Sequence, residues 1–372
     1  MSGGNEKTQA EHGNGNGRKK LNKKRLFIKT FFISIAIFAG IAGAGLFAAM
    51  KLAKPPALPS YADDPSPPEL AYYPAESHDD DKNIGNGVFL PEGFTMSDRK
   101  KDFYTFLIIG LDEGIQTDTI IVASYDGVNG EAHLINVPRD SLVNVKRPTK
   151  KINAAYGAGT LDGGGREGGV SQLRRELKTI IGFAPDFYVI INLNAFVRIV
   201  DAVEGVEVNV PINMIYDDPD QNLHINISRG LQTLYGREAL HFARYRQGND
   251  RSMDISDYKR IENQQQVIKA VLNKLLRPAN IVKIPEFIDI FNKNVFTNFK
   301  AEDILWFANE FKKIESADAL TMHTLPTSGT VRFNLSYEIL DEDGILELVN
   351  ATVNPYKKNI EPKDLDIITK ID

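Results

Sequence analysis

The stretch from Thr30 to Met50 constrains this chain most, because its 21 residues contain no charged side chain. A helix of that length rises about 31 Å, which is enough to cross the hydrocarbon core of a bilayer. The twelve residues before it carry seven Lys or Arg side chains, whereas only Lys51 and Lys54 follow it before Lys82. Positively charged flanks stay in the cytoplasm, so this asymmetry predicts a cytoplasmic N-terminus and an extracellular C-terminal portion.

A cleaved signal peptide is the alternative interpretation of the same stretch. The small residues from Ala42 to Gly45 offer a peptidase a cleavage site. The apolar run is nevertheless longer than the roughly 7–15 residues of a signal-peptide core. We therefore predict an uncleaved, single-pass type II anchor in the cell membrane at residues 30–50. Residues 1–29 would then form a basic, disordered cytoplasmic tail.

Composition narrows the chemistry that is expected outside the membrane. The chain has no cysteine, which excludes disulfides, thiolate nucleophiles and cysteine metal sites. Its formal net charge of −5 is too close to neutral for a nucleic-acid-binding surface outside the N-terminal tail. ATP is scarce on the outer face of a membrane. We therefore expect a substrate that is lipid-linked or part of a cell wall.

The residues after the anchor divide by composition into a linker, a folded domain and a tail. Residues 51–101 are rich in proline and acidic side chains and predict an extended extracellular linker. Residues 102–353 alternate apolar strands with helices, which predicts an α/β domain layered around one central sheet. Residues 354–372 are expected to form a polar C-terminal tail. The expected strands are Phe103–Ile109, Thr119–Tyr125, Ala132–Val137, Phe187–Asn192, Val206–Val210, Thr321–Leu325 and Thr330–Asn334, and the expected helices are Val170–Ile181, Asn194–Val203, Tyr235–Phe242, Ile255–Leu276, Pro285–Asn292 and Ala301–Ile314.

Charged residues cluster where the first three expected strands meet their loops. Asp112 follows the first strand and Asp118 opens the second, while Arg139 and Asp140 follow the third. If these strands are neighbours, the short turn between the second and third puts Asp118 and Arg139 at the same end of a hairpin. Two carboxylates suit Mg²⁺, which binds one or two of them together with phosphate oxygens. An arginine nearby suits bidentate contact with a phosphate.

A second polar cluster begins with Arg244 and Arg246, which point the same way if their segment is extended. On the following helix, Asp257, Arg260 and Gln264 are spaced by three and four residues and therefore share one face. Such a polar stripe at a helix start, beside two arginines, suits a pyrophosphate. The alternative is that these groups form ordinary solvated surface pairs, which contribute little to stability.

Seven short motifs in a fixed order behind the predicted anchor resemble one family, the LytR–CpsA–Psr proteins of Gram-positive bacteria. The similarity runs from Phe103 to about Leu276 and continues more weakly to about Asn350. The motifs are F-L-I-I-G-L-D, T-D-T-I, N-V-P-R-D-S, K-I-N-A-A-Y, V-D-A-V-E-G-V-E-V, G-R-E-A-L-H-F-A-R-Y-R and D-Y-K-R-I-E-N-Q-Q-Q.

The resemblance implies an α-β-α sandwich around a mixed central β-sheet, with an apolar pocket for a polyprenyl chain. The apolar faces of Val170–Ile181 and Phe196–Val203 are candidates for that pocket or for ordinary core. The implied activity is a Mg²⁺-dependent phosphotransferase. It would move a teichoic acid or capsular polysaccharide from an undecaprenyl-pyrophosphate carrier to peptidoglycan. By position, the resemblance implies that Asp112 and Asp118 bind magnesium. The implied pyrophosphate-binding and catalytic residues are Arg139, Arg244, Arg246, Asp257, Arg260 and Gln264. A further substrate-binding motif, which is partly structural, contains Lys151, Asn153 and Tyr156.

The chain departs from the family pattern at several positions, and two of these departures remove positive charge. Gln116 and Asn263 stand where arginines are common, which removes two positive charges near the expected phosphates. Either Asp257 or Asp140 could act as the general base.

Two alternatives to transfer stay open. One is a non-catalytic, membrane-anchored module that binds lipid-linked wall precursors and regulates, and the other is a pyrophosphatase that acts on the same lipid.

Overall fold

A computed structural model describes residues 52–58, 91, 93–111, 115–219, 223–275, 290, 294–310, 313, 319–332 and 335–368. The chain divides into two units, residues 1–53 and residues 54–372, and the second contains the fold described below. The predicted anchor at residues 30–50 lies outside the described residues, as do most of the linker and Asp112. Within the described part of the chain, no helix has the length and apolar character needed to span a bilayer.

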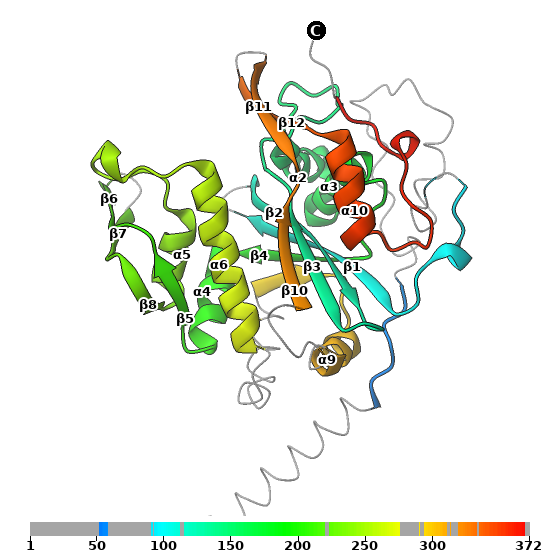
Figure 1. Ribbon diagram of the computed structural model, residues 1–372, viewed down its shortest axis with the longest axis horizontal. Helices are drawn as coiled ribbons and strands as arrows, with labels where there is room; N and C mark the ends of the chain where they lie inside the picture. Colours follow the sequence, from blue (N-terminus) through cyan, green and yellow to red (C-terminus); the bar gives the residue numbers. More distant parts are fainter. Residues whose placement is uncertain are drawn as a thin grey trace, which may run out of the picture. The chain divides into compact units, whose positions relative to one another are not determined.

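Six strands form a mixed central sheet with the order β10-β3-β2-β1-β4-β9 (Figure 1). β1 pairs with β2, and β2 with β3, in antiparallel fashion, whereas β4 and β10 join as parallel neighbours of β1 and β3. The strands are β1 (Phe103–Leu111), β2 (Thr117–Asp126), β3 (Glu131–Asn136), β4 (Phe187–Asn192), β9 (Val295–Thr297) and β10 (Leu320–Thr324). The α/β class and the adjacency of the first three strands are therefore confirmed.

The turn between β2 and β3 explains why these strands form a hairpin at this point. The Asp126 carboxylate accepts hydrogen bonds from the backbone amides of Val128 and Asn129, at 2.9 and 3.0 Å. Gly130 closes the turn with a φ of +70°, a conformation that side chains disfavour. The short connection puts the start of β2 and the end of β3 at the same edge of the sheet.

Helices pack on both faces of this sheet (Figure 1). One face shares a hydrophobic core with α3 (Gly165–Ile181) and α10 (Glu342–Thr352). The other face lies toward four helices, which are α4 (Leu193–Ala202), α5 (Gly236–Arg244), α6 (Asp257–Leu275) and α9 (Ala301–Glu310). The short helical segments are η3 (Met96–Asp98), η4 (Ile152–Ala154), α2 (Ala155–Gly159), η5 (Thr160–Gly164), η7 (Arg251–Met253) and η10 (Pro362–Asp364).

Three further strand pairs lie outside the central sheet. They are β5 (Val206–Val210) with β8 (Gly230–Leu234), β6 (Met214–Asp218) with β7 (Leu223–Ile227), and β11 (Thr327–Arg332) with β12 (Leu335–Leu340). The first two pairs share a second hydrophobic core with α4, α5 and α6. Sequence analysis missed β6, β7, β8, β9, β12 and α10. The missed strands have three to six residues, which is too short for a clear periodicity. The expected helix Pro285–Asn292 lies almost wholly outside the described residues.

Segments at both ends of the expected domain pack into the same fold. Phe94 contacts Tyr356 edge-on, with ring centroids 5.0 Å apart, and Ile360 is also buried in the core. Arg99 is buried and donates to the Asp186 carboxylate at 2.8 Å. The folded unit therefore includes residues that the sequence assigned to the linker at 51–101 and to the polar tail at 354–372.

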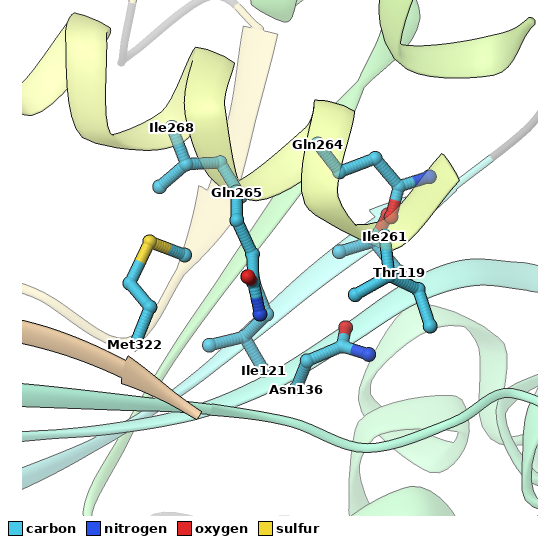
Figure 2. Close-up of a pocket in the computed structure, with 8 residues that line it drawn as sticks. All are labelled: Thr119, Ile121, Asn136, Ile261, Gln264, Gln265, Ile268 and Met322. Carbon is cyan, nitrogen blue, oxygen red and sulfur yellow. The ribbon is translucent and has the colours of Figure 1, made fainter. Parts of the chain in front are cut away.

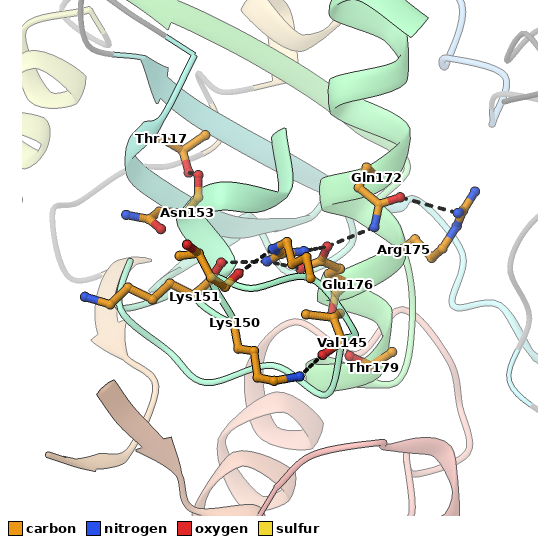
Figure 3. A network of polar contacts seen from close by, with 11 residues as sticks. Thr117, Val145, Lys150, Lys151, Asn153, Gln172, Arg175, Glu176 and Thr179 are labelled. Atoms are coloured by element: carbon orange, nitrogen blue, oxygen red, sulfur yellow. Dashed lines mark hydrogen bonds and ion pairs between the residues drawn. The ribbon is translucent and has the colours of Figure 1, made fainter. Parts of the chain in front are cut away.

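A buried ion pair joins the loop after β3 to α3. The Arg147 guanidinium makes two hydrogen bonds to the Glu176 carboxylate, and both side chains are less than a tenth exposed. Arg147 also donates to the backbone oxygens of Thr149 and Lys151, at 2.7 and 2.6 Å. Figure 3 shows Glu176 and Lys151 within this network, with Gln172 donating to the same carboxylate. Sequence analysis did not single out Arg147.

We expect Glu176→Gln to lower the free energy of unfolding by about 3–5 kcal/mol, because it leaves the buried Arg147 charge without its counter-charge. Urea denaturation monitored by circular dichroism measures this change. Glu347→Gln is the matched control, since Glu347 is exposed on α10, and it should change stability by less than about 0.5 kcal/mol. Equal effects of the two substitutions would show that the ion pair does not stabilise the loop.

Candidate functional site

A cavity of about 320 Å³ lies between the central sheet and helices α4, α5 and α6. Its lining combines two kinds of side chain. Apolar side chains come from β1, β2, β4 and the three helices, and charged side chains come from β2, the loop after β3, the end of α5 and α6. The apolar lining consists of Ile108, Leu111, Ile121, Ile191, Leu193, Phe196, Leu240, Ala243, Val267 and Ile268. The charged lining consists of Asp118, Arg139, Arg244, Arg246 and Arg260.

The first charged cluster is fixed by an ion pair between β2 and the loop after β3. The Nη1 of Arg139 donates to Oδ1 of Asp118 at 2.8 Å, and both side chains are about one third exposed. This contact confirms that the two residues share one end of the β2–β3 hairpin. The Nε of Arg139 is buried and has no hydrogen-bond partner in the structure. Arg139 therefore retains a donor, in a guanidinium that lines the cavity.

A bulge in β2 allows Asp118 to face the cavity. In the register with β1, Gly110 pairs with Thr119 and Leu111 pairs with Thr117, so Asp118 is left without a partner residue. Both Asp118 and Thr119 line the cavity, which a regular strand would not permit because successive side chains alternate between faces. Gly110 makes this geometry possible, because a Cβ there would lie 2.9 Å from the Thr119 Cβ.

The backbone of the Arg139 loop is held from both sides. Ser141 closes the turn by donating its amide to the Pro138 carbonyl at 3.0 Å. The amide of Asn153 donates to the Arg139 carbonyl at 3.1 Å, and the Asn153 carbonyl accepts from Oγ1 of Thr117 at 3.2 Å. Figure 3 shows Thr117 and Asn153 in this contact. Asn153 thus ties the arginine loop to the residue before Asp118, and it does so through its backbone.

The second cluster lies where α5 ends. Tyr245 is buried and donates its hydroxyl to the Met253 carbonyl at 3.1 Å, while Arg244 and Arg246 on either side line the cavity. Both arginines therefore line one cavity, although Arg244 is the last residue of α5 and not part of an extended segment. On α6, Arg260 and Gln264 line the same cavity, and Nε2 of Gln264 donates to the Ala243 carbonyl at 3.3 Å. That hydrogen bond fastens the polar face of α6 to the last turn of α5.

His241 lies on α5, one turn before Arg244. Burial lowers the pKa of the imidazole, and the nearby Arg237 and Arg244 lower it further.

Several predicted residues are not on the cavity lining. Lys151 pairs with Asp140 at 2.9 Å, and Asn153 contributes backbone contacts. Tyr156 is buried in the core of the α3 side of the sheet. The apolar face of Val170–Ile181 belongs to the same core, so of the two pocket candidates only the α4 stretch contributes, through Phe196. Asp112 lies outside the described residues, and so does the side chain of Asp257, at the start of α6.

Among the described residues of the cavity lining, Asp118 is the carboxylate that could hold a Mg²⁺ ion. Asp118 offers a partly exposed carboxylate, of which Oδ1 accepts from Arg139. Mg²⁺ in phosphate sites commonly uses one or two carboxylates and several waters rather than an all-protein cage. Within the described residues, no group of three or more His, Asp or Glu side chains is arranged to hold a metal ion.

A small recess of about 10 Å³ adjoins the cavity, with space for about one water molecule (Figure 2). Asn136 and Gln265 are among its lining residues, and Nε2 of Gln265 donates to Oγ1 of Thr324 at 3.4 Å. Four residues line both spaces: Thr119, Ile121, Gln264 and Ile268.

The two departures from the expected charge pattern lie off the cavity lining. Gln116 is exposed just before β2. Asn263 is 2% exposed on α6, and its Nδ2 has no hydrogen-bond partner in the structure. Neither residue is part of the lining, which contains four arginines.

Sequence reasoning missed most of the apolar lining. Ile108, Ile191 and Leu240 belong to apolar runs in which each side chain has the character of ordinary core. Hydrophobicity identified these runs as buried, but it carries no signal for which side chains border an open space.

Comparison with known proteins places this geometry in one family. The model of the LytR_cpsA_psr family matches residues 73–354. Regulatory protein MsrR of Staphylococcus aureus (strain COL) is 26% identical over 260 residues, which covers 68% of this chain and 66% of MsrR. Polyisoprenyl-teichoic acid–peptidoglycan teichoic acid transferase TagV of Bacillus subtilis (strain 168) is 27% identical over 239 residues, covering 61% of this chain and 56% of TagV.

The crystal structure of B. subtilis TagV has the same fold. It superposes with a TM-score of 0.55 at 23% identity and covers 68% of this chain and 96% of the TagV structure. The match thus spans about two thirds of the length of MsrR and little more than half of TagV. Because the family model matches well over half of the residues, this chain belongs to the LytR–CpsA–Psr family.

Proposed function

We propose that this protein transfers an anionic glycopolymer of the teichoic acid type from an undecaprenyl-pyrophosphate carrier to peptidoglycan. One observation carries the proposal: four arginines and Asp118 line the same cavity as ten apolar side chains. A ligand that satisfies both kinds of side chain must join an anionic group to a hydrocarbon chain. A polyprenyl diphosphate has this composition.

The arginines suit a diphosphate better than a carboxylate ligand. Arg139, Arg244, Arg246 and Arg260 bring four positive charges to the cavity, against one described carboxylate, Asp118. A guanidinium presents a planar set of donors that matches phosphate oxygens, and such contacts strengthen where water is excluded. The excess of positive charge thus complements the several negative charges of a diphosphate.

In the proposed reaction, a sugar hydroxyl oxygen of peptidoglycan attacks the phosphorus on the glycopolymer side. A new P–O bond forms, the bond to the bridging oxygen breaks, and undecaprenyl phosphate leaves with that oxygen. The arginines would stabilise the charge on the equatorial and leaving oxygens. No ATP is required, because the diphosphate link already contains the energy.

The hydroxyl proton must pass to a base. Asp140 is poorly suited, because it pairs with Lys151 and does not line the cavity. Asp257 begins α6, the helix that carries Arg260 and Gln264 to the cavity, and it is our candidate.

Mg²⁺ is part of the proposal, held by Asp118 and Asp112 with the diphosphate. When bound, it would neutralise charge on the phosphate oxygens. We further propose that residues 30–50 anchor the protein in the cell membrane, with residues 102–353 as the extracellular catalytic domain. The donor and the peptidoglycan acceptor would then both be within reach.

The relatives support transfer and keep one alternative in view. TagV carries the name of a teichoic acid transferase that joins polyisoprenyl-teichoic acid to peptidoglycan. MsrR carries the name of a regulatory protein, which favours a binding module as the second candidate. Hydrolysis of the same lipid, with water in place of the sugar hydroxyl, is the third.

One experiment separates these functions. Full-length protein is incubated with a lipid-pyrophosphate glycan, peptidoglycan fragments and either Mg²⁺ or EDTA, and the products are resolved by mass spectrometry. Glycan joined to the acceptor supports transfer, free glycan phosphate supports hydrolysis, and saturable binding without turnover supports the regulatory module. Equal turnover with Mg²⁺ and with EDTA would contradict the metal requirement.

Arg139→Ala should lower kcat/KM for transfer by about 10²–10³-fold, because it removes a charged donor that is positioned for the transition state. Arg139→Lys retains the charge but not the planar set of donors, so its kcat/KM should fall between those of the wild type and of Arg139→Ala. Arg229→Ala is the matched control, because Arg229 is exposed outside the cavity lining, and it should retain wild-type activity. An Arg139→Ala variant with near-full turnover would contradict the assignment of this residue.

Phe196→Ser should raise KM for a long-chain donor by about 10-fold with little change in kcat, because removal of buried apolar area weakens binding of the hydrocarbon. A donor analogue with a short, water-soluble chain should show no such change. Ile215→Ser is the control, since Ile215 is an exposed apolar residue of β6 outside the cavity lining. Equal effects on long and short donors would indicate that the cavity does not hold the lipid.

A further inference from the structure

We propose that Asp140, Lys151 and Tyr337 form a positioning device that holds Arg139 against Asp118. This inference rests on the proposed function for its kinetic consequences, but the geometry that carries it is independent of any substrate. Lys151 was expected to bind substrate. In the structure it does not line the cavity, so it would act through the arginine loop.

The device starts from the ammonium group of Lys151. Its Nζ lies 2.9 Å from Oδ1 of Asp140 and 5.7 Å from the centre of the Tyr337 ring. The side chains of Lys151 and Asp140 are 18% and 26% exposed, and Tyr337 is fully buried. Partial burial strengthens the ion pair, and the ring face attracts the cation, so Lys151 is confined beside Asp140.

The same hairpin that supplies Tyr337 also holds the arginine loop by its backbone. The Glu338 amide donates to the Asp140 carbonyl at 3.0 Å, and the Leu142 amide donates to the Glu338 carbonyl at 2.8 Å. Leu142 packs with Tyr337 in a small buried cluster. β12 thus fixes both the side-chain partner of Asp140 and the main chain that flanks it.

Lys151 is itself anchored on the opposite side. Its carbonyl accepts from Nη2 of Arg147 at 2.6 Å, and Arg147 is paired with Glu176 on α3. Two residues later, the Asn153 amide holds the Arg139 carbonyl. Backbone hydrogen bonds from β12 and from Asn153 therefore both hold the turn that contains Arg139. The ion pair between Asp140 and Lys151 adds a side-chain contact to them.

The consequence concerns the direction of the Arg139 guanidinium. Asp140 follows Arg139 in the chain, so loss of its ion pair frees the turn that aims the guanidinium at Asp118 and the cavity. A misplacement of about 1 Å at a reacting group can lower a rate by about 100-fold. We therefore assign Asp140, Lys151 and Tyr337 as positioning residues.

A double-mutant cycle in the full-length protein tests this. Asp140→Asn and Lys151→Met should each lower kcat for transfer by about 10-fold, with little change in KM for the donor. The double variant should lose about the same 10-fold rather than 100-fold, because both substitutions break one contact. Independent, multiplied effects would overturn the proposal. So would a Lys151→Met variant that raises KM while Asp140→Asn retains full activity, since Lys151 would then bind the phosphate directly.

The aromatic support has its own variants. Tyr337→Phe keeps the ring face and should retain kcat, whereas Tyr337→Leu should lower it about as much as Lys151→Met. The matched control is the exposed pair of Glu361 and Lys363, 2.9 Å apart, for which Glu361→Gln and Lys363→Met should leave kcat unchanged. A Tyr337→Phe variant as impaired as Tyr337→Leu would remove Tyr337 from the device. Thermal unfolding of each variant identifies losses that come from misfolding.

A spectroscopic measurement separates failure of this inference from failure of the proposed function. The buried Nε–H of Arg139 should give a slowly exchanging arginine signal in ¹⁵N NMR of the labelled full-length protein without any donor. Asp140→Asn and Lys151→Met should shift this signal and speed its exchange, whereas Glu361→Gln should not. If the wild type shows no transfer but the signal responds, the proposed function fails and the positioning device stands. An unchanged Arg139 signal in both variants overturns the positioning device.

Discussion

The ion pair between Arg139 and Asp118 joins the two elements on which the candidate site depends. Asp118 reaches the cavity because β2 bulges at that residue, and Arg139 reaches it because the turn after β3 is held by the backbone of Asn153. The contact joins the start of β2 to the turn after β3. Because both side chains are about one third exposed, its net contribution to stability is small. Its importance lies in fixing direction.

The cavity combines two requirements that are costly to satisfy together. Four arginines line the cavity beside apolar side chains, and their like charges repel one another. Two hydrogen bonds hold the segments that carry these arginines. Gln264 donates to the end of α5, and the buried Tyr245, between Arg244 and Arg246, donates to the Met253 carbonyl. An anionic ligand with a hydrocarbon tail relieves the repulsion and fills the apolar space. This complementarity connects the geometry to polyprenyl diphosphate transfer.

The sequence predicted much of the fold and of the polar site because the relevant signals are local. Apolar runs identified β1 and β4, and the Asp126 to Gly130 turn identified the β2–β3 hairpin that brings Asp118 to Arg139. Helical spacing put Arg260 and Gln264 on one face of α6, and both line the cavity. The strands β6, β7, β8, β9 and β12 were not predicted, because each has only three to six residues. The roles of Lys151 and Asn153 were not predicted, because the groups that they contact come near them only in the folded protein.

The sequence by itself determined which residue types are present and which local elements they form: strands from apolar runs, turns from Asp and Gly, and a helix with one polar face. Only the tertiary structure decided that Asp118 leaves its strand register, that Lys151 faces Asp140, and that a space remains open between the sheet and α4–α6. The physical reason is that register shifts, ion-pair partners and cavities arise from how elements far apart in the chain fit together. An unfilled volume in particular depends on every side chain around it, so no local pattern encodes it.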